Sequence, residues 1–126
     1  MIFVDTDILI DFLNDCEPVA SGLVRQGCWG ELRTTVINRF ELLAGVRTWR
    51  EEKNVRLLLA WIPALPLGPA AADQAAEIHR SLERRGAAIG RNDSLIAGIV
   101  LHHSGSLLTR NLRHFERIPG LSLVSL

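Results

Sequence analysis

Short apolar segments alternate with segments of helical periodicity along the whole chain, and this alternation constrains the fold more than any other feature. Residues 2–5 are predicted to form a buried strand, and the helix that follows over 6–13 carries apolar residues at helical spacing. Further strands are predicted over 31–36, 63–69 (short, or an edge segment), 106–109 and 121–126, and further helices over 17–26, 37–46, 50–61, 70–85 and 93–103. Such alternation is typical of an α/β fold, with helices on both faces of a mostly parallel sheet.

The chain of 126 residues is long enough for one hydrophobic core, and no linker or repeat interrupts it. We therefore expect a single domain over residues 1–126. No apolar run approaches the ~18 residues needed to cross a membrane, and the N-terminus lacks the pattern of a signal peptide. The sequence predicts a cytoplasmic protein with no membrane partner. Cys16 and Cys28 lie in no metal-binding pattern and are predicted to be reduced thiols.

Three acidic residues lie where such a fold directs side chains inward. Asp5 ends the apolar run of the first strand, Glu41 interrupts an apolar helix, and Asp93 opens the most hydrophobic helix of the chain. A carboxylate in an apolar environment destabilises the fold unless a cation lies beside it. Mg²⁺ or Mn²⁺ suits ligands that are all oxygen atoms. These residues therefore predict a metal-dependent enzyme.

The topology brings these separate segments to one edge of the sheet. Ligands of open parallel sheets bind beyond the carboxyl ends of the strands, where Asp5 and the segment 109–111 lie. Asp93, at the start of a helix, faces the same edge. A purely structural alternative exists, since Asp5 is also placed to cap the first helix, and Asn92 or Asp93 to cap theirs. The two interpretations are compatible.

The net charge of zero predicts no general attraction to nucleic acid, but the charges are unevenly distributed. Residues 1–24 contain five acidic and no basic residues, whereas arginines predominate from position 80 onward. An acidic pocket with a basic rim suits a metal ion together with a phosphate backbone, although solvated helix faces would also explain the pattern. The candidates for phosphate contact are Arg47, Arg50, Arg84, Arg85, Arg91 and Arg110.

Four motifs in order resemble those of PIN-domain ribonucleases, in particular the VapC-type toxins of toxin–antitoxin pairs. They are Val-Asp-Thr-Asp-Ile-Leu-Ile-Asp at 4–11, Glu-Leu-Leu-Ala-Gly-Val at 41–46, Asn-Asp-Ser-Leu-Ile-Ala at 92–97, and Leu-Thr-Arg-Asn at 108–111 with His114 and Phe115. The resemblance spans almost the whole chain and implies a three-layer α/β/α PIN-like fold. It also implies an endoribonuclease that uses Mg²⁺, with Mn²⁺ able to substitute, and that cuts single-stranded or loop RNA such as tRNA, rRNA or mRNA. The implied partners are a small antitoxin that covers the site and a second copy in a homodimer.

Carried over by position, the resemblance makes Asp5, Glu41 and Asp93 the metal-binding and catalytic acids. Asn111 joins the catalytic set where many members carry a fourth acid, and His114 stands where others have Asp. An Asn oxygen is able to bind a metal ion or a metal-bound water but adds no negative charge, which argues against a second tightly held ion. The edge of the site is assigned to Thr6, Asp7, Thr109 and His114, with Asp7 also explained as an acid of the first helical turn.

Two alternatives remain at this point. Asp5-Thr6-Asp7 after a strand resembles the opening motif of haloacid dehalogenase-type phosphatases, but those enzymes also need a lysine and a later acidic pair. Lys53 is the only lysine, and no Asp-Asp pair follows. The other alternative is a PIN-like module that binds RNA or protein without cutting it, because a fourth acid is missing.

Overall fold

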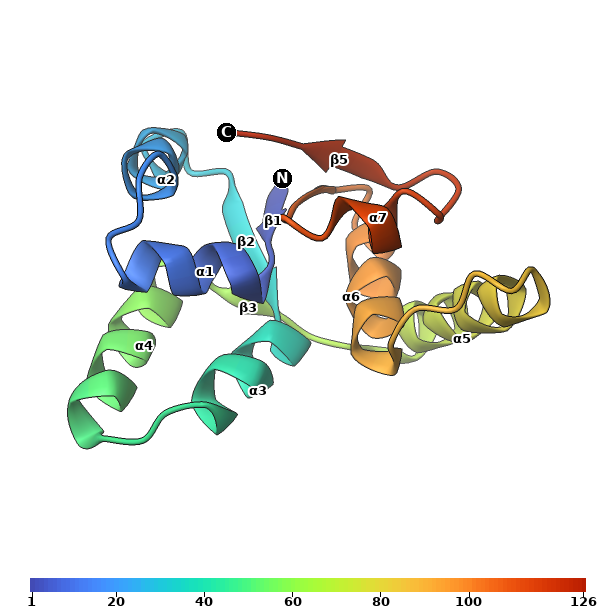
Figure 1. The fold of residues 1–126 in the computed structure, drawn as a ribbon, viewed down its shortest axis with the longest axis horizontal. Coiled ribbons are helices and arrows are strands. Elements are labelled where there is room, and N and C mark those ends of the chain that lie inside the picture. Colours follow the sequence, from blue (N-terminus) through green and yellow to red (C-terminus); the bar gives the residue numbers. More distant parts are fainter.

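The computed structural model describes residues 1–126, which form a five-stranded sheet with helices against both faces (Figure 1). The strands are β1 (Ile2–Val4), β2 (Leu32–Thr35), β3 (Ala64–Leu65), β4 (Ser106–Leu108) and β5 (Ser122–Val124). The helices are α1 (Thr6–Leu13), α2 (Val19–Gly27), α3 (Val36–Ala44), α4 (Trp49–Trp61), α5 (Pro69–Arg84), α6 (Arg91–His102) and α7 (Leu112–Phe115).

The sheet has the strand order β3-β2-β1-β4-β5, and every neighbouring pair is parallel. Ile2 of the central strand β1 lies opposite Leu32 of β2 on one side and Ser106 of β4 on the other. The chain builds outward from β1 to β2 and β3, then crosses to β4 and β5. The strand order therefore reverses between β1 and β4, and the carboxyl ends of these two strands flank the crevice in which open α/β sheets bind ligands.

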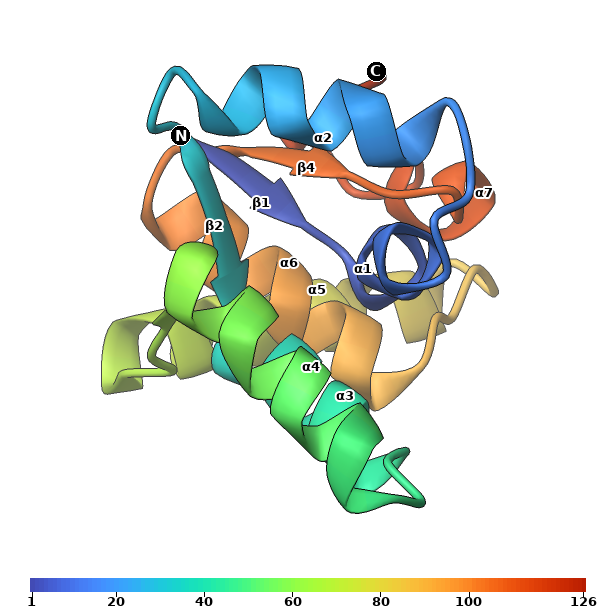
Figure 2. The same cartoon turned by 90° about the vertical axis from the view of Figure 1, so that its left-hand side faces the viewer.

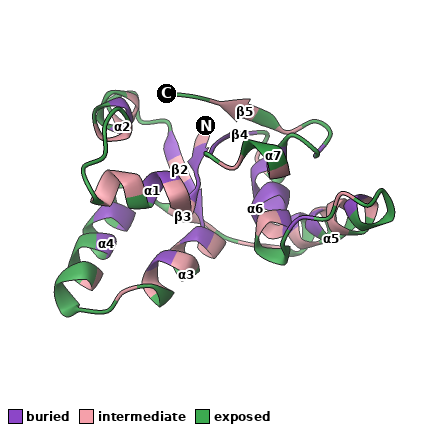
Figure 3. Cartoon of the chain, viewed as in Figure 1, coloured by how far each residue is buried: buried purple, intermediate pink, exposed green.

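Successive residues of the central strands point to opposite faces of the sheet and enter two separate hydrophobic cores. Phe3 and Leu107 pack with α5, α6 and α7, whereas Val4 and Leu108 pack with α1, α2 and α4. Figure 2 shows β1, β2 and β4 between these helices, and Figure 3 shows the buried residues gathered on the strands and on the helix sides that face them. The predicted three-layer α/β/α architecture is confirmed.

Helix α6 packs closely against α5 because one residue at the contact has no side chain. A Cβ atom at Gly98 would lie 2.7 Å from the Ala71 carbonyl oxygen and 2.7 Å from Ala75 Cβ. This close approach fixes the position of α6, whose first turn carries Asp93 toward the carboxyl ends of the strands.

No helix is long and apolar enough to span a membrane.

The predicted elements are all present, and their ends agree within two residues except for the segment 63–69, of which only Ala64–Leu65 forms the strand β3. Two points of the sequence interpretation were wrong. The short helix α7, over Leu112–Phe115, was not predicted, because four residues are too few to show helical periodicity. The N-cap of α6 is Gly90, which lies before both Asn92 and Asp93 and makes no side-chain cap. The side chains of Asn92 and Asp93 are therefore free to make other contacts.

Candidate active site

Asp5 lies at the centre of the candidate site, between the end of β1 and the start of α1. It caps α1, since its Oδ1 accepts a hydrogen bond of 2.8 Å from the Thr6 backbone N–H. The same oxygen accepts 2.9 Å from Asn38 Nδ2, and Oδ2 accepts 2.7 Å from Thr109 Oγ1. Asp5 is only 6% exposed. The backbone of β1 and three hydrogen bonds thus hold this carboxylate in one orientation.

The surroundings of Asp5 disfavour its negative charge. The pKa of Asp5 is raised from the ordinary value of 3.8 to about 6. Burial is the main cause, and the nearby charges of Asp7 and Asp93 act in the same direction, whereas the hydrogen bonds from Thr109 and the Thr6 N–H lower the pKa. No lysine or arginine contributes to this balance. The site therefore concentrates negative charge that a bound cation would compensate.

Glu41 reaches the site from α3 and links the starts of two other helices. Its Oε1 accepts a hydrogen bond of 2.7 Å from Thr6 Oγ1 at the start of α1. Its Oε2 accepts 3.2 Å from Asn92 Nδ2 in the first turn of α6. The residue is partly buried, as expected for a glutamate that interrupts an apolar helix. Both oxygens are directed toward the elements that carry Asp5 and Asp93.

Asp93 faces α7, the helix that the sequence did not predict. Its Oδ2 lies 2.9 Å from His114 Nδ1, and the same ring nitrogen lies 2.9 Å from Asn111 Nδ2. One ring nitrogen either donates to the carboxylate or accepts from the amide, so only one of these hydrogen bonds forms at a time. Asn111, predicted as a catalytic residue, thus directs its amide nitrogen toward the His114 ring.

Asp7 and Thr109 connect the start of α1 with the end of β4. Asp7 Oδ2 accepts a hydrogen bond of 3.1 Å from the Arg110 backbone N–H, and Thr109 Oγ1 accepts 3.0 Å from the Asn111 N–H. Asp7 also lies in the first turn of α1, which agrees with its interpretation as a helix acid. Asp7 and Thr109, two of the residues assigned to the edge of the site, thus link the segments that follow β1 and β4.

Two residues of this network were missed in the sequence: Asn38, which contacts Asp5, and Asn92, which contacts Glu41. Asn38 had a recognisable signal. Thr35 and Asn38 form a capping box at the start of α3. The spacing Thr-x-x-Asn of this box is visible in the sequence, with its Asn three residues before Glu41. Asn92 directly precedes Asp93 and was predicted only as a possible helix cap and as the first residue of the motif 92–97.

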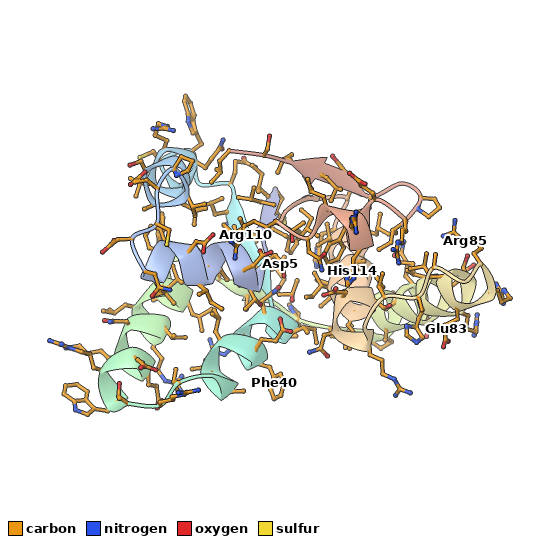
Figure 4. All side chains as sticks on the ribbon, viewed as in Figure 1. Asp5, Phe40, Glu83, Arg85, Arg110 and His114 are labelled. Atoms are coloured by element: carbon orange, nitrogen blue, oxygen red, sulfur yellow. The ribbon has the colours of Figure 1, made fainter.

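The six candidate arginines are all exposed but lie in different places. Figure 4 shows Arg110 and His114 near Asp5 in the middle of the molecule, whereas Arg85 lies at the far end of α5. Arg110 Nε is 3.3 Å from Asp11 Oδ2. Arg85 donates 2.9 Å to the Arg117 carbonyl and so joins the end of α5 to the segment after α7. Arg91 begins α6, Arg84 ends α5, and Arg47 and Arg50 lie near the start of α4.

The donor set fits a hard divalent cation. Asp5 offers carboxylate oxygens from the cap of α1, Glu41 from within α3, and Asp93 from the first turn of α6. The charge at Asp5 is not compensated by a basic residue. As their side chains stand, no three acidic, histidine or cysteine residues surround a single point closely enough to hold one ion. Mg²⁺ commonly binds through one or two protein carboxylates and keeps several waters, which matches this arrangement.

The family model of the PIN domain matches residues 2–121. The chain belongs to the PIN-domain family. This membership decides against the phosphatase alternative, which shares only the opening Asp-x-Asp of this PIN domain.

Ribonucleases of the VapC group are similar to this PIN domain over nearly its whole length. Ribonuclease VapC10 of Mycobacterium tuberculosis is 34% identical over 121 residues, which cover 96% of this chain and 90% of the relative. Ribonuclease VapC1 of Rickettsia felis is 31% identical, and the match covers 98% of this chain and 95% of the relative. The tRNA(fMet)-specific endonuclease VapC of Salmonella typhimurium is 34% identical over 95 residues, 69% of each chain.

Solved structures share the fold. VapBC from Salmonella typhimurium bound to DNA has a TM-score of 0.85 at 26% identity and covers 98% of this PIN domain and 96% of that chain. VapBC2 from Rickettsia felis, bound to a DNA fragment from its promoter, has a TM-score of 0.90 at 23% identity and covers 100% and 99%. The arrangement of strands and helices described above is therefore that of VapC proteins.

Proposed function

We propose that this chain is a metal-dependent endoribonuclease and the toxin of a toxin–antitoxin pair. One observation carries the proposal: acids from three distant segments, Asp5, Glu41 and Asp93, lie on elements that hydrogen bonds link to one another beside the point where the strand order reverses. Thr6 links α1 to Glu41, Asn92 links Glu41 to α6, and burial raises the pKa of Asp5 to about 6. The similarity to proteins named as VapC ribonucleases supports the same activity.

The proposed cofactor is Mg²⁺, for which Mn²⁺ would substitute. Asp5, Glu41 and Asp93 would hold it, and when bound it supplies a water of lowered pKa and stabilises negative charge at the phosphorus. The protein side chains keep these acids oriented: Thr109 holds Asp5, Thr6 holds Glu41, and His114 holds Asp93 when its Nδ1 carries the proton. Asn111 adds no negative charge, which supports a site with one tightly held ion.

The proposed substrate is single-stranded or loop RNA of the tRNA, rRNA or mRNA class. A relative in Salmonella typhimurium and another in Shigella flexneri are named tRNA(fMet)-specific endonucleases, which supports structured RNA as the substrate. Arg110 follows β4 directly beside the site and is 61% exposed, so we assign it to the phosphate backbone. Arg91, two residues before Asp93, is the second candidate on position. Arg85 is the weakest candidate for phosphate contact, because its guanidinium already donates to the Arg117 carbonyl oxygen.

We further propose that an antitoxin covers the site and that two copies of the chain pair. Several similar structures are VapBC toxin–antitoxin complexes. A groove of about 330 Å³ beside Glu41 would give such a partner an apolar seat. It lies between α1, α3 and α4, and its apolar lining is Ile10, Leu13, Leu42, Val46 and Val55. A chain segment in this groove would end against the acid site and exclude RNA from it.

A PIN-like module that binds RNA without cutting it is the alternative, and it is favoured by Asn111 in place of a fourth acid. A cleavage assay separates the two. Wild type, Asp93→Asn and the control Asp73→Asn, an exposed acid of α5, are incubated with structured RNA in Mg²⁺, Mn²⁺ or EDTA. We expect cleavage by wild type and by the control in either metal and none in EDTA. If wild type cleaves no more than Asp93→Asn in any metal, the nuclease proposal fails.

The antitoxin proposal has a test of its own. The chain is purified after expression together with the gene adjacent to its own, and the purified material is assayed for a second small protein and for RNA cleavage. We expect a small protein to co-purify and cleavage to be suppressed until that protein is removed. A second protein that leaves cleavage unchanged would contradict a partner that covers the site.

A further inference from the structure

Asn38 is a buried side chain whose orientation is fixed by the cap of α3. It is 1% exposed and occupies the third position of that helix. Its Oδ1 accepts hydrogen bonds from Thr35 Oγ1, at 2.7 Å, and from the Thr35 backbone N–H, at 3.3 Å. Its own backbone N–H donates a hydrogen bond of 3.2 Å to Thr35 Oγ1. Since the oxygen end is bound by two donors, the amide nitrogen must point the other way.

The amide nitrogen of Asn38 points between two of the acids. It donates 2.9 Å to Asp5 Oδ1 and 2.9 Å to Thr6 Oγ1. Because Thr6 Oγ1 accepts this bond, its own proton is free for Glu41 Oε1, at 2.7 Å. A directed chain of hydrogen bonds thus runs from Asn38 to Asp5 and, through Thr6, to Glu41. Asn38 and Glu41 are three residues apart on α3 and therefore share one face of that helix.

We propose that Asn38 is a positioning residue, which holds the carboxylates of Asp5 and Glu41 in the orientation that binds the metal ion. The inference rests on the proposed function, since it concerns the same site. Every hydrogen-bonding position of the Asn38 side chain is used, and no buried side-chain nitrogen or oxygen lacks a partner. The amide also places two N–H groups of positive partial charge beside Asp5 and Thr6.

A role limited to capping α3 does not account for these contacts. The cap uses Oδ1 and the backbone N–H of Asn38, and both face Thr35. The two Nδ2 protons take no part in the cap, and they are the atoms of Asn38 that contact Asp5 and Thr6. Residues that orient metal ligands in this way typically contribute 10–100-fold to metal affinity or activity.

The test compares three variants. Asn38→Ala removes the whole contact. Thr6→Val keeps the shape of the side chain and the bond from Asn38 to Asp5 but removes the hydroxyl that reaches Glu41. Thr48→Ala is the matched control, because Thr48 caps α4 by accepting from the Glu51 N–H and contacts none of the acids. For each protein, the Mn²⁺ affinity is measured by calorimetry and the melting temperature by thermal unfolding, both without RNA. The kcat and KM for RNA cleavage are then measured at saturating Mn²⁺.

We expect Asn38→Ala to bind Mn²⁺ about 10–100-fold more weakly and Thr6→Val about 10-fold more weakly, while Thr48→Ala keeps the wild-type affinity despite a lower melting temperature. For Asn38→Ala we expect kcat to fall with KM for RNA unchanged, because the buried amide does not reach RNA. Wild-type Mn²⁺ affinity in Asn38→Ala, or an equal loss in Thr48→Ala, overturns the inference. If Asn38→Ala does not fold, wild-type affinity in Thr6→Val overturns it. Failure of wild type itself to bind Mn²⁺ instead refutes the proposed function and the inference with it.

Discussion

Replacing Asp5 with Asn should stabilise the metal-free protein at high pH. The pKa of Asp5 is raised to about 6 from 3.8, chiefly because burial removes water from the carboxylate. Since the pKa is higher in the folded than in the unfolded chain, the stability linked to this proton is fully present below pH 3.8 and is lost as pH rises through about 6. A difference of about 2 between the pKa values corresponds to about 3 kcal/mol above pH 7. Asn has the same shape, its oxygen accepts from Thr6 and Asn38, and it carries no charge.

The assay is thermal or urea unfolding in EDTA at pH 4 and pH 8. Asp5→Asn should be more stable than wild type by up to about 3 kcal/mol at pH 8, a rise in melting temperature of up to roughly 10 °C, and the gain should shrink toward zero at pH 4. Asp73→Asn is the control and should show no such pH dependence. Adding Mn²⁺ should stabilise wild type but not Asp5→Asn. The same gain at both pH values, or a loss at pH 8, would refute the electrostatic reasoning.

Three further predictions follow from the same contacts. Glu41→Gln keeps an acceptor for Thr6 but loses the charge, so kcat/KM in a gel assay of RNA cleavage should fall by about 100-fold or more; near-normal cleavage would contradict its role as a ligand. Arg110→Ala should weaken RNA binding and reduce the slope of log affinity against log salt by about 0.7, whereas Arg85→Ala should leave this slope unchanged; equal slopes in both would exclude a direct phosphate contact by Arg110. Gly98→Ala should lower the free energy of unfolding in urea by about 1–3 kcal/mol, since the new Cβ would lie 2.7 Å from the atoms of α5; unchanged stability would mean that the two helices separate at no cost.

The fold could be predicted because its signals are local. Residues 2–4 are all apolar, as expected for a central parallel strand that is buried on both faces of the sheet. The observed β1 places Phe3 and Val4 in the two cores on opposite faces. The segment 37–46 was predicted as a helix, and α3 begins one residue earlier, at Val36. Helix α7 escaped because its four residues stand between a strand and a loop and are too few to show a period.

The candidate site was only partly predictable. The positions of Asp5, Glu41 and Asp93 followed from motifs and from the rule that ligands bind at strand ends. The links between them did not, because each is a contact between residues far apart in sequence: Asn38 lies 33 residues from Asp5, and Asn92 lies 51 residues from Glu41. Neutral amides carry no charge pattern that would single them out, so their roles emerge only once the segments are packed together.

Calorimetric titration of Mn²⁺ into the metal-free protein tests the central claim most directly, because it asks whether three acids from three segments form one site. The titration is run on wild type and on Asp5→Asn, Glu41→Gln and Asp93→Asn, each first shown by circular dichroism to be folded. The account predicts a single tight site in wild type and a loss of affinity of at least about 10-fold in each variant. Binding in wild type that any one of the three variants retains at full strength would contradict it.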